Sequence, residues 1–480
     1  MRYRKLRFAL LASLIPISLL LHLKIFNLDL MGVHVWRQTQ TQTVINNFVE
    51  GDFWIGNPRV NNLLYPDGVL RLEFPLMQWL FASVGKLFGG GYLTSRILTF
   101  LVGLFTVLGF YTFLNALFNN KLLASIGAWC FNFSPLFFYY TTNPLPDNFA
   151  LSMGVWSLAF FAKFIKSLNE KQLLVSFAFL ALSAMCKLPF ILFASVYLAY
   201  FLPKLLNGEL KIGKALLVLG SFLLFLIPFF VWYGKVIPTW GKDGVLVGIF
   251  SNTYQSNYLE IIGGTFVSIL PELLLNYGAV LFFLAGFYFM IRNKTYTDSR
   301  FIPLAMLGVC LIGYFIFEAN IIALVHDYYL FPFLPLLFTL VAYGAVHLIQ
   351  SKQKWIVIIS VLALFILPLT AYLRCQSRWN PKEPGFNVAY YNHKAELRNL
   401  LSKDGLCLIE NDISGVIALY YLDRKGFMLN ENYNSKSFND FKNLGVKYFV
   451  VDSKADTSII QKPFLTKKIF DKDDLRVYEL

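Results

Sequence analysis

MRYRKLRFALLASLIPISLLLHLKIF, residues 1–26, decides the class of fold, because basic residues precede an apolar run long enough to cross a membrane. Arg2, Arg4, Lys5 and Arg7 indicate that the N-terminus faces the cytoplasm, since cytoplasmic segments carry an excess of lysine and arginine. No small-residue cleavage site follows Leu21–Phe26. We therefore interpret this segment as a retained transmembrane helix and not as a signal peptide.

The composition of the 480 residues agrees with a membrane protein. The chain is 57% hydrophobic and only 15% charged, whereas about a quarter of the residues of a soluble domain are charged. A net charge of +14 would suit a nucleic acid partner, but the basic residues stand in short clusters between apolar runs. This pattern is typical of membrane topology, so we expect a lipid bilayer and no nucleic acid as a partner.

Apolar segments recur along the chain, and a helix needs about 20 such residues to cross the hydrocarbon core. We predict eleven transmembrane helices. They are Phe8–Phe26, Ile97–Phe118, Leu122–Tyr140, Phe149–Ile165, Leu173–Cys186, Leu188–Leu206, Ala215–Tyr233, Thr265–Ile291, Phe301–Phe317, Tyr328–Ile349 and Trp355–Leu373. The apolar segment Pro75–Phe88 is shorter and predicts an interfacial or re-entrant helix.

The charges between these spans predict which side each loop faces. If Pro75–Phe88 crossed the membrane, every later basic loop would lie outside, against the positive-inside rule. With eleven spans, the cytoplasmic segments hold only Glu170, Glu209 and Asp298 as acids. The acids expected on the opposite side are Asp29, Glu50, Asp52, Asp67, Glu73, Asp147, Asp243, Glu260, Glu272, Glu318 and Asp327. We expect a multi-pass protein of the cell (inner or plasma) membrane with an extracytoplasmic C-terminal domain.

The composition changes sharply after the last span, which predicts two domains. Residues 1–374 form a transmembrane domain with a first outer loop, 27–74, and an interfacial helix, 75–88. Residues 375–480 form a small extracytoplasmic α/β domain. Its short buried strands are predicted at 406–410, 426–430, 447–452 and in the final LRVYEL, with helices at 412–422 and 437–444 and a turn at 471–474.

The densest polar stretch is HVWRQTQTQ, residues 34–42. His34 can titrate, the Arg37 guanidinium suits a phosphate or carboxylate, and the Gln38 amide can orient hydroxyl groups. A solvated loop explains the stretch equally well. Glu73 stands where the chain returns to the membrane, and partial burial beside Phe74 and Pro75 would make it useful as a general base. The alternative role of Glu73 is to interact with a helix dipole.

Three further candidates stand next to later spans. Asp147 follows two prolines and begins a helix, so it is either an N-cap or a rigidly held site residue. Lys187 is a lone cation on the predicted outer side, which favours an anionic ligand. His326, Asp327 and Tyr328 open another span. Adjacent residues on a helix do not face each other, so we predict a phosphate- or sugar-binding surface there and no His–Asp dyad.

Familiar nucleotide and metal motifs are missing from the sequence. It has no Walker loop, no GxGxxG after a strand, no HExxH and no CxxC pair. We therefore expect neither nucleotide-driven transport nor dinucleotide chemistry, and no ligand spacing demands a metal.

The order of these pieces resembles the GT-C class of membrane glycosyltransferases. The resemblance lies within the protein O-mannosyltransferase-like superfamily, which includes glycosyltransferase family 39, RgtA/B/C/D-like proteins and aminoarabinose transferases. It spans nearly all of residues 1–350 and rests on the long first outer loop, 73–76 (EFPL), 94–96 (TSR), 143–147 (NPLPD), 185–187 (MCK) and Tyr328-Tyr329 with its prolines. Many members carry an Asp-Glu pair early in the first outer loop, but that window holds Arg37-Gln38 in this chain.

The resemblance implies transfer of a sugar, with inversion, from a polyprenyl-phosphate donor to a lipid, glycan or protein acceptor on the extracytoplasmic face. On this basis Glu73 or Asp147 is the expected general base, with Asp29 or His34 as substitutes. Arg37, Gln38, Lys187, His326, Asp327 and Tyr328 would then bind the substrate or the lipid phosphate. A divalent cation, Mg²⁺ or Mn²⁺, is compatible with the resemblance as a cofactor.

Two other functions are consistent with a polytopic chain. A lipid or polysaccharide flippase or transporter would have charges buried in the middle of its spans, whereas here they gather at one rim. A polysaccharide polymerase or ligase generally has its large outer loop late in the chain, whereas here the longest loop of the membrane domain is the first.

Overall fold

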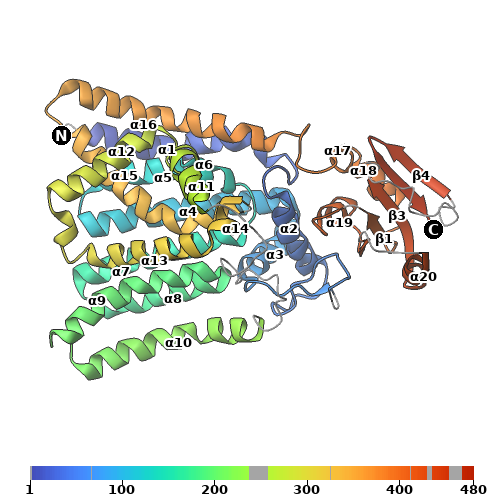
Figure 1. Ribbon diagram of the computed structural model, residues 1–480, viewed down its shortest axis with the longest axis horizontal. Helices are drawn as coiled ribbons and strands as arrows, with labels where there is room; N and C mark the ends of the chain where they lie inside the picture. Colours follow the sequence, from blue (N-terminus) through green and yellow to red (C-terminus); the bar gives the residue numbers. More distant parts are fainter. Residues whose placement is uncertain are drawn as a thin grey trace. The chain divides into compact units, whose positions relative to one another are not determined.

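The computed structural model describes residues 3–65, 68–236, 258–324, 326–410, 412–429, 435–452 and 467–480. Asp67 and Asp243, expected on the outer side, lie outside these residues. The chain forms two compact units (Figure 1). The first comprises Met1–Leu23, Ile97–Thr142 and Pro146–Cys375, and the second comprises Lys24–Arg96, Asn143–Leu145 and Gln376–Leu480.

The first unit is entirely helical where it is described. Its elements are α1 (Arg4–Phe26, which runs on into the second unit), α4 (Tyr92–Phe118, which begins in the second unit), α5 (Lys121–Asn132), α6 (Pro135–Tyr140), α7 (Pro146–Ser167), α8 (Glu170–Cys186), η2 (Leu188–Ala194), α9 (Ser195–Leu206), α10 (Ile212–Val236), α11 (Tyr258–Gly264), η5 (Thr265–Leu274), α12 (Gly278–Arg292), η6 (Thr295–Thr297), α13 (Ile302–Phe317), α14 (Ala319–Leu324), η7 (Asp327–Phe333), α15 (Leu334–Ile349) and α16 (Lys354–Cys375). Every span predicted from the sequence lies mainly on helical residues, but 133–134 and 275–277 within two of these spans are not helical.

Not every predicted span is one long helix, however. Among the described residues, seven helices are long and apolar enough to cross a membrane, or up to eight if the bent pair Leu259–Leu274 and Gly278–Arg292 is one span. Ile302–Phe317 is a shorter apolar helix. The predicted span 122–140 is divided into α5 and α6, because Ser134 is the N-cap of a new helix that starts at Pro135. The predicted span 265–291 bends by 112°, where Asn276 and Tyr277 have positive φ.

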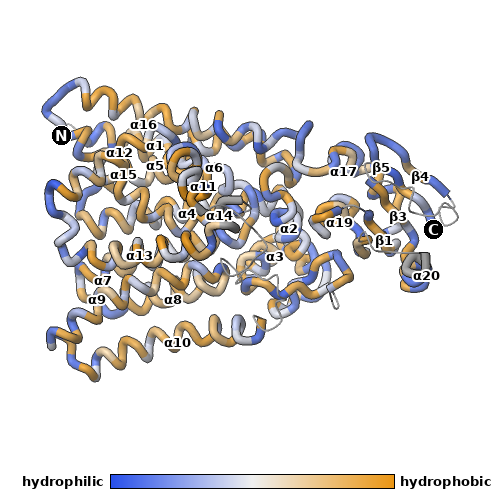
Figure 2. The backbone as a smooth tube through the Cα atoms, in the orientation of Figure 1, coloured by the Kyte–Doolittle hydropathy of each residue, from blue (hydrophilic) through white to orange (hydrophobic). Residues whose placement is uncertain are grey.

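Burial distinguishes the centre of the helical unit from its periphery. Every residue of α5 from Leu122 to Asn132 is buried, and most of α7 is buried as well. By contrast, α10 and α16 expose large apolar side chains along their length, including Leu217, Leu224, Leu362 and Leu369. Figure 2 shows the helices as mainly hydrophobic and the loops between them as hydrophilic. Apolar surface on this scale is stable only in contact with lipid.

The second unit contains the first outer segment and the C-terminal residues. Residues 27–74 were expected as a long polar loop, but they hold the helix α2 (Val35–Glu50). The next helix is α3 (Leu76–Phe88). The short α3 coincides with the interfacial helix predicted at 75–88. The remaining helices of this unit are η8 (Gln376–Trp379), α17 (Val388–Asn392), α18 (Lys394–Leu400), α19 (Ile417–Leu422) and α20 (Ser435–Asn443).

The α2 helix is polar in sequence yet buried, which the sequence did not reveal. Residues 37–43 (RQTQTQT) are all buried. The threonine hydroxyls donate to backbone carbonyls one turn earlier, from Thr39 to Val35, from Thr41 to Arg37 and from Thr43 to Thr39. Because each hydroxyl finds an acceptor within its own helix, its burial leaves no donor unsatisfied.

The C-terminal residues form a five-stranded mixed sheet in the order β2-β1-β3-β5-β4. The strands are β1 (Leu406–Glu410), β2 (Gly426–Leu429), β3 (Val446–Asp452), β4 (Lys467–Lys472) and β5 (Leu475–Glu479). β1 is parallel to β2 and to β3, whereas β3–β5 and β5–β4 are antiparallel. β1, β2, β3 and β5 coincide with predicted strands, and β4 was not foreseen.

Alternation along the strands gives the sheet two apolar faces. Cys407 and Ile409 pack with α17, α18 and α19 in a large core that also contains Leu30 and Val35. Leu408 and Phe449 pack on the other face with Phe441 of α20. The first outer segment also pairs with the sheet, because Gly426 N–H donates to Asn61 O and Leu63 N–H donates to Gly426 O. Segments more than 350 residues apart in sequence thus share one core.

A close helix contact in the first unit gives a test of the fold. A Cβ atom on Gly344 of α15 would lie 2.0 Å from the carbonyl oxygen of Phe282 in α12. We expect Gly344→Ala to lower the free energy of unfolding by about 1–3 kcal/mol, because overpacking forces the two backbones apart. Thermal unfolding of the full chain in neutral detergent measures the change.

Gly313→Ala is the matched control, because no atom lies within 4 Å of a Cβ placed there. Alanine in a helix with open space should be neutral or stabilising. Equal losses for the two variants would contradict the close α12–α15 contact.

Candidate functional site

Asp147 and Lys187 form a buried ion pair in the helical unit. Asp147 lies in the first turn of α7 after Pro146, and Lys187 occupies the extended residue between α8 and η2. Lys187 Nζ lies 3.2 Å from Asp147 Oδ1, with side chains only 10% and 2% exposed. Charges this deeply buried are stable only when compensated. Asp147 and Lys187, which were predicted from the sequence as separate site residues, thus contact each other in the structure.

Aromatic rings surround the lysine. Lys187 Nζ lies 4.3 Å from the ring centroid of Tyr329 and 5.5 Å from that of Tyr328, at the start of η7. Such cation–π contacts hold an ammonium group without neutralising its charge. The His326 ring is 5.2 Å and 4.9 Å from the rings of Tyr328 and Tyr329. The predicted residues His326 and Tyr328 thus belong to the same cluster as Lys187.

Asp327 joins the cluster through Tyr140 of α6. The Tyr140 hydroxyl donates to Asp327 Oδ1 at 2.5 Å, and its ring lies 5.9 Å from that of Tyr328. Tyr140 could not be selected from the sequence, because it stands in the aromatic run 137–140 (FFYY), which is equally typical of an apolar core.

Glu318 is the second residue that the sequence analysis did not select. It follows α13, is 6% exposed and interacts electrostatically with Lys187. Its Oε2 atom is buried and has no hydrogen-bond partner among the described residues. In the sequence, Glu318 is a single acid at the end of an apolar helix. It was expected on the outer side, but nothing in the sequence indicated that it belongs to the site. The cluster of Asp147, Lys187, Glu318, His326, Asp327, Tyr328, Tyr329 and Tyr140 is called the lysine cluster below.

In the second unit, Arg37 of α2 pairs with Glu73. Their side chains are 6% and 10% exposed, and Arg37 also donates to Gln40 one turn later in α2. An adjoining cavity holds only about 20 Å³, which is room for a single water molecule. The Glu73 carboxylate thus faces the Arg37 guanidinium, and its role as a general base stays a prediction.

Gln38 and Asp29, two further candidates, are held by contacts within the second unit. The Gln38 amide donates to Val33 O at 2.9 Å and to Met31 O at 3.3 Å. Asp29 accepts from Leu30 N–H and from the Tyr420 hydroxyl, both at 2.7 Å, and pairs with Lys394. These contacts hold Asp29 and Gln38 within the second unit, and their roles as a substitute base and a substrate-binding residue stay predictions.

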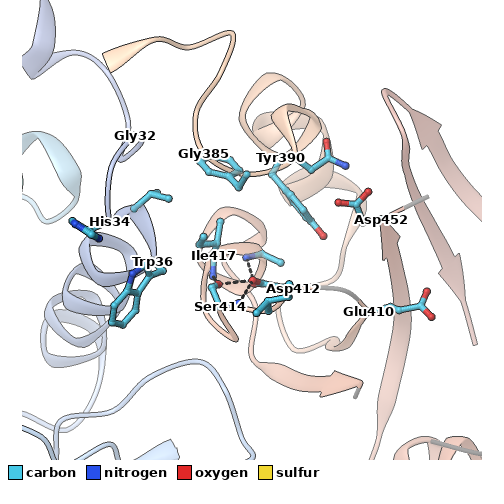
Figure 3. A pocket seen from close by; sticks show the side chains of 15 residues that line it. Gly32, His34, Trp36, Gly385, Tyr390, Glu410, Asp412, Ser414, Ile417 and Asp452 are labelled. Carbon is cyan, nitrogen blue, oxygen red and sulfur yellow. Dashed lines mark hydrogen bonds between the residues drawn. The ribbon is translucent and has the colours of Figure 1, made fainter. Parts of the chain in front are cut away.

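His34 precedes α2 in the left-handed conformation, with φ 57°, and lines a cavity of about 720 Å³ in the second unit. The cavity is also lined by Trp36, Tyr390, Asp412 and Asp452. Figure 3 shows the Tyr390 hydroxyl pointing between Asp412 and Asp452. Burial and the charges of these two carboxylates raise the pKa of Tyr390 well above its usual range. The cavity thus has a negative, aromatic lining at the carboxyl ends of β1 and β3.

Among the described residues, no group of three or more His, Cys, Asp and Glu side chains is arranged to hold a metal ion. The compatibility of the chain with Mg²⁺ or Mn²⁺ as a cofactor stays a prediction.

The fold places the chain in a known class. It is similar to ArnT from Cupriavidus metallidurans bound to undecaprenyl phosphate, with a TM-score of 0.67, 13% identity, and coverage of 98% of this chain and 97% of that chain. The Archaeoglobus fulgidus oligosaccharyltransferase tethered to an acceptor peptide gives a TM-score of 0.54 at 13% identity, covering 94% of this chain and 70% of that one. For the mycobacterial arabinofuranosyltransferase AftD the TM-score is 0.56 at 14% identity, with 98% and 40% covered.

The chain therefore has the GT-C fold of membrane glycosyltransferases, which confirms the resemblance and the fold class predicted from the sequence. Residues 73–232 match the family model described as dolichyl-phosphate-mannose-protein mannosyltransferase. That range contains Glu73, Asp147 and Lys187. No curated protein matches the chain in sequence.

The Arg37–Glu73 pair makes a first prediction for this site. Glu73→Gln leaves the buried guanidinium without its carboxylate, so we expect it to lower the free energy of unfolding by about 3–5 kcal/mol. In Arg37→Met/Glu73→Gln both charges are absent, and the loss should be smaller. Thermal unfolding of the two variants and the parent chain measures both values. A double variant at least as unstable as Glu73→Gln would show that the pair is not the stabilising contact.

A second prediction concerns Glu410, at the end of β1. Burial raises the pKa of Glu410 from 4.5 to about 7. The folded state therefore holds this proton more tightly than the unfolded state, and stability falls as the pH rises through this interval. We expect Glu410→Gln to be more stable than the parent chain at pH 8.5 and equal to it at pH 4, measured by thermal unfolding.

Glu396→Gln is the matched control with the opposite sign. Hydrogen bonding to Lys472 lowers the pKa of Glu396, so its stabilising effect is present at neutral pH and is lost as the pH falls. Its replacement should therefore reduce stability at pH 8.5. The same pH trend in both variants would contradict this assignment.

Proposed function

We propose that the chain is a glycosyltransferase that moves a sugar from a polyprenyl-phosphate donor to a hydroxyl-bearing acceptor. The observation that carries the proposal is the lysine cluster, in which a buried cation faces a carboxylate beneath aromatic rings. A phosphate leaving group needs a fixed positive charge, and an acceptor hydroxyl needs a base. The GT-C fold and the match over 73–232 support the same chemistry.

The proposed reaction is a direct displacement at the anomeric carbon of the sugar. The acceptor oxygen forms a bond to this carbon while the bond from the carbon to the phosphate oxygen breaks, and the electron pair leaves with the lipid phosphate. The acceptor's proton passes to the base. One displacement at one carbon inverts its configuration. We assign Asp147 as the base and Lys187 as the cation that stabilises the departing phosphate.

The ion pair predicts an order of events for this assignment. Asp147 Oδ1 and Lys187 Nζ lie 3.2 Å apart, so a donor phosphate that engages Lys187 competes with Asp147 for the ammonium group. The Asp147 carboxylate is then available to the acceptor hydroxyl. The His326 ring lies against Tyr328 and Tyr329, the same tyrosines that Lys187 contacts, and its nitrogen atoms are further groups that can contact the donor phosphate.

Glu318 and Asp327 balance the charge of the cluster in different ways. The Asp327 carboxylate accepts a hydrogen bond from the Tyr140 hydroxyl, which fixes the orientation of this carboxylate. Glu318 lies near enough to Lys187 to interact with it. In its protonated form Glu318 adds no charge against an incoming phosphate. We therefore assign Glu318 a positioning role toward Lys187 and not a catalytic one.

The orientation of the protein is part of the proposal. The basic residues of 1–7 and of the later loops favour an N-terminus in the cytoplasm. The lysine cluster would then meet its donor on the extracytoplasmic face of the cell membrane, and the C-terminal sheet would lie on the same side. The acceptor is a lipid, a glycan or a protein segment.

Asp147→Asn tests the base. The variant keeps the size of the side chain but cannot accept the proton. We expect the rate of sugar transfer to fall by at least about 10²-fold, the lower end of general-base contributions. Release of free polyprenyl phosphate from a labelled donor by the purified full chain measures the rate.

Lys187→Met in the same assay should raise the KM for the donor by more than about tenfold, since a charge-assisted contact to phosphate is lost, and Lys187→Arg should retain part of it. Glu170→Gln removes an acid from an exposed ion pair with Lys214 and serves as the control that keeps parental activity. Full activity of Asp147→Asn, with thermal stability unchanged, would remove Asp147 from the mechanism.

A further inference from the structure

A second large cavity lies in the helical unit, away from the lysine cluster. It holds about 710 Å³ and is lined where α4, α7 and α9 end and where α13 begins. Small-molecule sites in proteins usually hold about 300–1,000 Å³. Every residue that lines it lies in the described part of the chain. This end of the bundle carries the basic loops that we expect on the cytoplasmic side.

The lining of this cavity is divided into a polar rim and an apolar floor. Lys166, Lys204 and Arg300 stand at the rim with one acid, Glu209. The floor includes Leu117, Ala162 and Ala199, all buried. Asn119, Asn207 and Ser299 add groups that donate hydrogen bonds at the rim. An occupant with an anionic, hydrogen-bond-accepting head and an apolar body would match both parts.

The two lysines are held in place but not neutralised. Lys166 Nζ donates to Asn119 Oδ1 at 2.9 Å, and Lys204 Nζ lies 4.7 Å from the ring centroid of Tyr200. Neither lysine forms an ion pair with a carboxylate of the described residues. Arg300 does pair with Asp298, at 2.5 Å, and its other arm reaches Leu117 O at 3.4 Å. With Glu209 and Asp298 both counted, the rim keeps an excess of positive charge.

The helix dipole explains part of this clustering of basic residues. Lys166 and Lys204 lie in the last turns of α7 and α9, where a cation interacts favourably with the helix dipole. That interaction explains one lysine on each helix. It does not explain why Arg300, from the turn before α13, converges with these two lysines on one cavity with an apolar floor.

The surface beside the cavity indicates what kind of anion fits. The outward face of α9 exposes Leu198, Leu202 and Leu206, and the packed helix α13 exposes Ile302, Met306 and Val309. Free phosphate makes no favourable contact with this apolar surface, whereas the acyl chains of a lipid can cover it. Basic pockets between membrane helices on the cytoplasmic side are suited to anionic lipid headgroups.

We propose that the cavity lined by Lys166, Lys204 and Arg300 binds an anionic glycerophospholipid, with its phosphate at the basic rim and its acyl chains against α9 and α13. The lipid is a structural partner, separate from the polyprenyl-phosphate donor. The inference does not rest on the proposed function, because it uses none of the residues of the lysine cluster.

The test is lipid binding to the purified full chain in a neutral detergent, measured by native mass spectrometry. Phosphatidylglycerol is compared with phosphatidylcholine of identical acyl chains, and glycerol phosphate is added as a water-soluble competitor. We expect the parent chain to prefer phosphatidylglycerol. Each basic residue near a membrane surface contributes about fivefold to such binding. Lys166→Gln/Lys204→Gln/Arg300→Gln should therefore weaken phosphatidylglycerol binding at least tenfold and leave phosphatidylcholine binding unchanged.

Lys121→Gln/Lys352→Gln/Lys354→Gln is the matched control, since it removes the same charge from residues that do not line the cavity. It should retain the preference, and Lys166→Gln/Lys204→Gln, which keeps the Arg300–Asp298 pair, should lose most of it. Thermal unfolding shows whether each variant is folded. Equal losses in the control, no preference in the parent chain, or full displacement by equimolar glycerol phosphate would each overturn the proposal.

Discussion

The ion pair between Lys187 and Asp147 is the constraint on which the arrangement of the helical unit depends. A lysine that is about 10% exposed has to be compensated, and the chain achieves this by starting α7 at the Pro146-Asp147 turn and ending α8 one residue before Lys187. The start of η7 then brings Tyr328 and Tyr329 over the ammonium group. Residues from three separate parts of the sequence thus meet around one buried ammonium group, which each of them contacts.

The second unit depends on buried polar contacts of another kind. Arg96 is fully buried and donates to Leu28 O, Asp29 O and Asn143 Oδ1. Asp29 in turn contacts Tyr420 and Lys394 from the C-terminal residues. The outer segment, the 143–145 turn and the sheet are thus parts of one folded unit. Residues that resemble catalytic candidates by type, such as Asp29, owe their burial to this structural role.

The positions of the helices and strands could be predicted from the sequence better than the breaks within the predicted helices. The apolar segments located helical residues in every predicted span, although the count of eleven spans stays a prediction. Short buried runs located β1, β2, β3 and β5. The breaks at Ser134 and at Asn276-Tyr277 could not be predicted, because they depend on packing that overrides an apolar pattern. For residues 34–42 the sequence left a solvated loop and a functional stretch equally open. Burial of this stretch could not be predicted, because it depends on threonine hydroxyls that donate within their own helix, α2.

For the candidate site, several residues could be selected from the sequence by their type and position, but the contacts between them could not be predicted. Asp147, Lys187, His326, Asp327 and Tyr328 were selected from their positions beside apolar spans, and the structure brings them into one cluster. The partners Tyr140 and Glu318 were missed, since an aromatic run and a helix-ending acid have ordinary structural explanations. Arg37 and Glu73 were selected independently, and no sequence rule showed that each would neutralise the other.

The most direct test of the account follows the two parts of a labelled donor separately. The purified chain is reconstituted into liposomes that contain a polyprenyl-phosphate sugar labelled on the sugar, together with a membrane extract as the source of acceptor. The account predicts that the label moves to another molecule while free polyprenyl phosphate accumulates in equal amount. Movement of the intact labelled lipid from one leaflet to the other, with no free polyprenyl phosphate, would contradict glycosyl transfer and indicate a flippase.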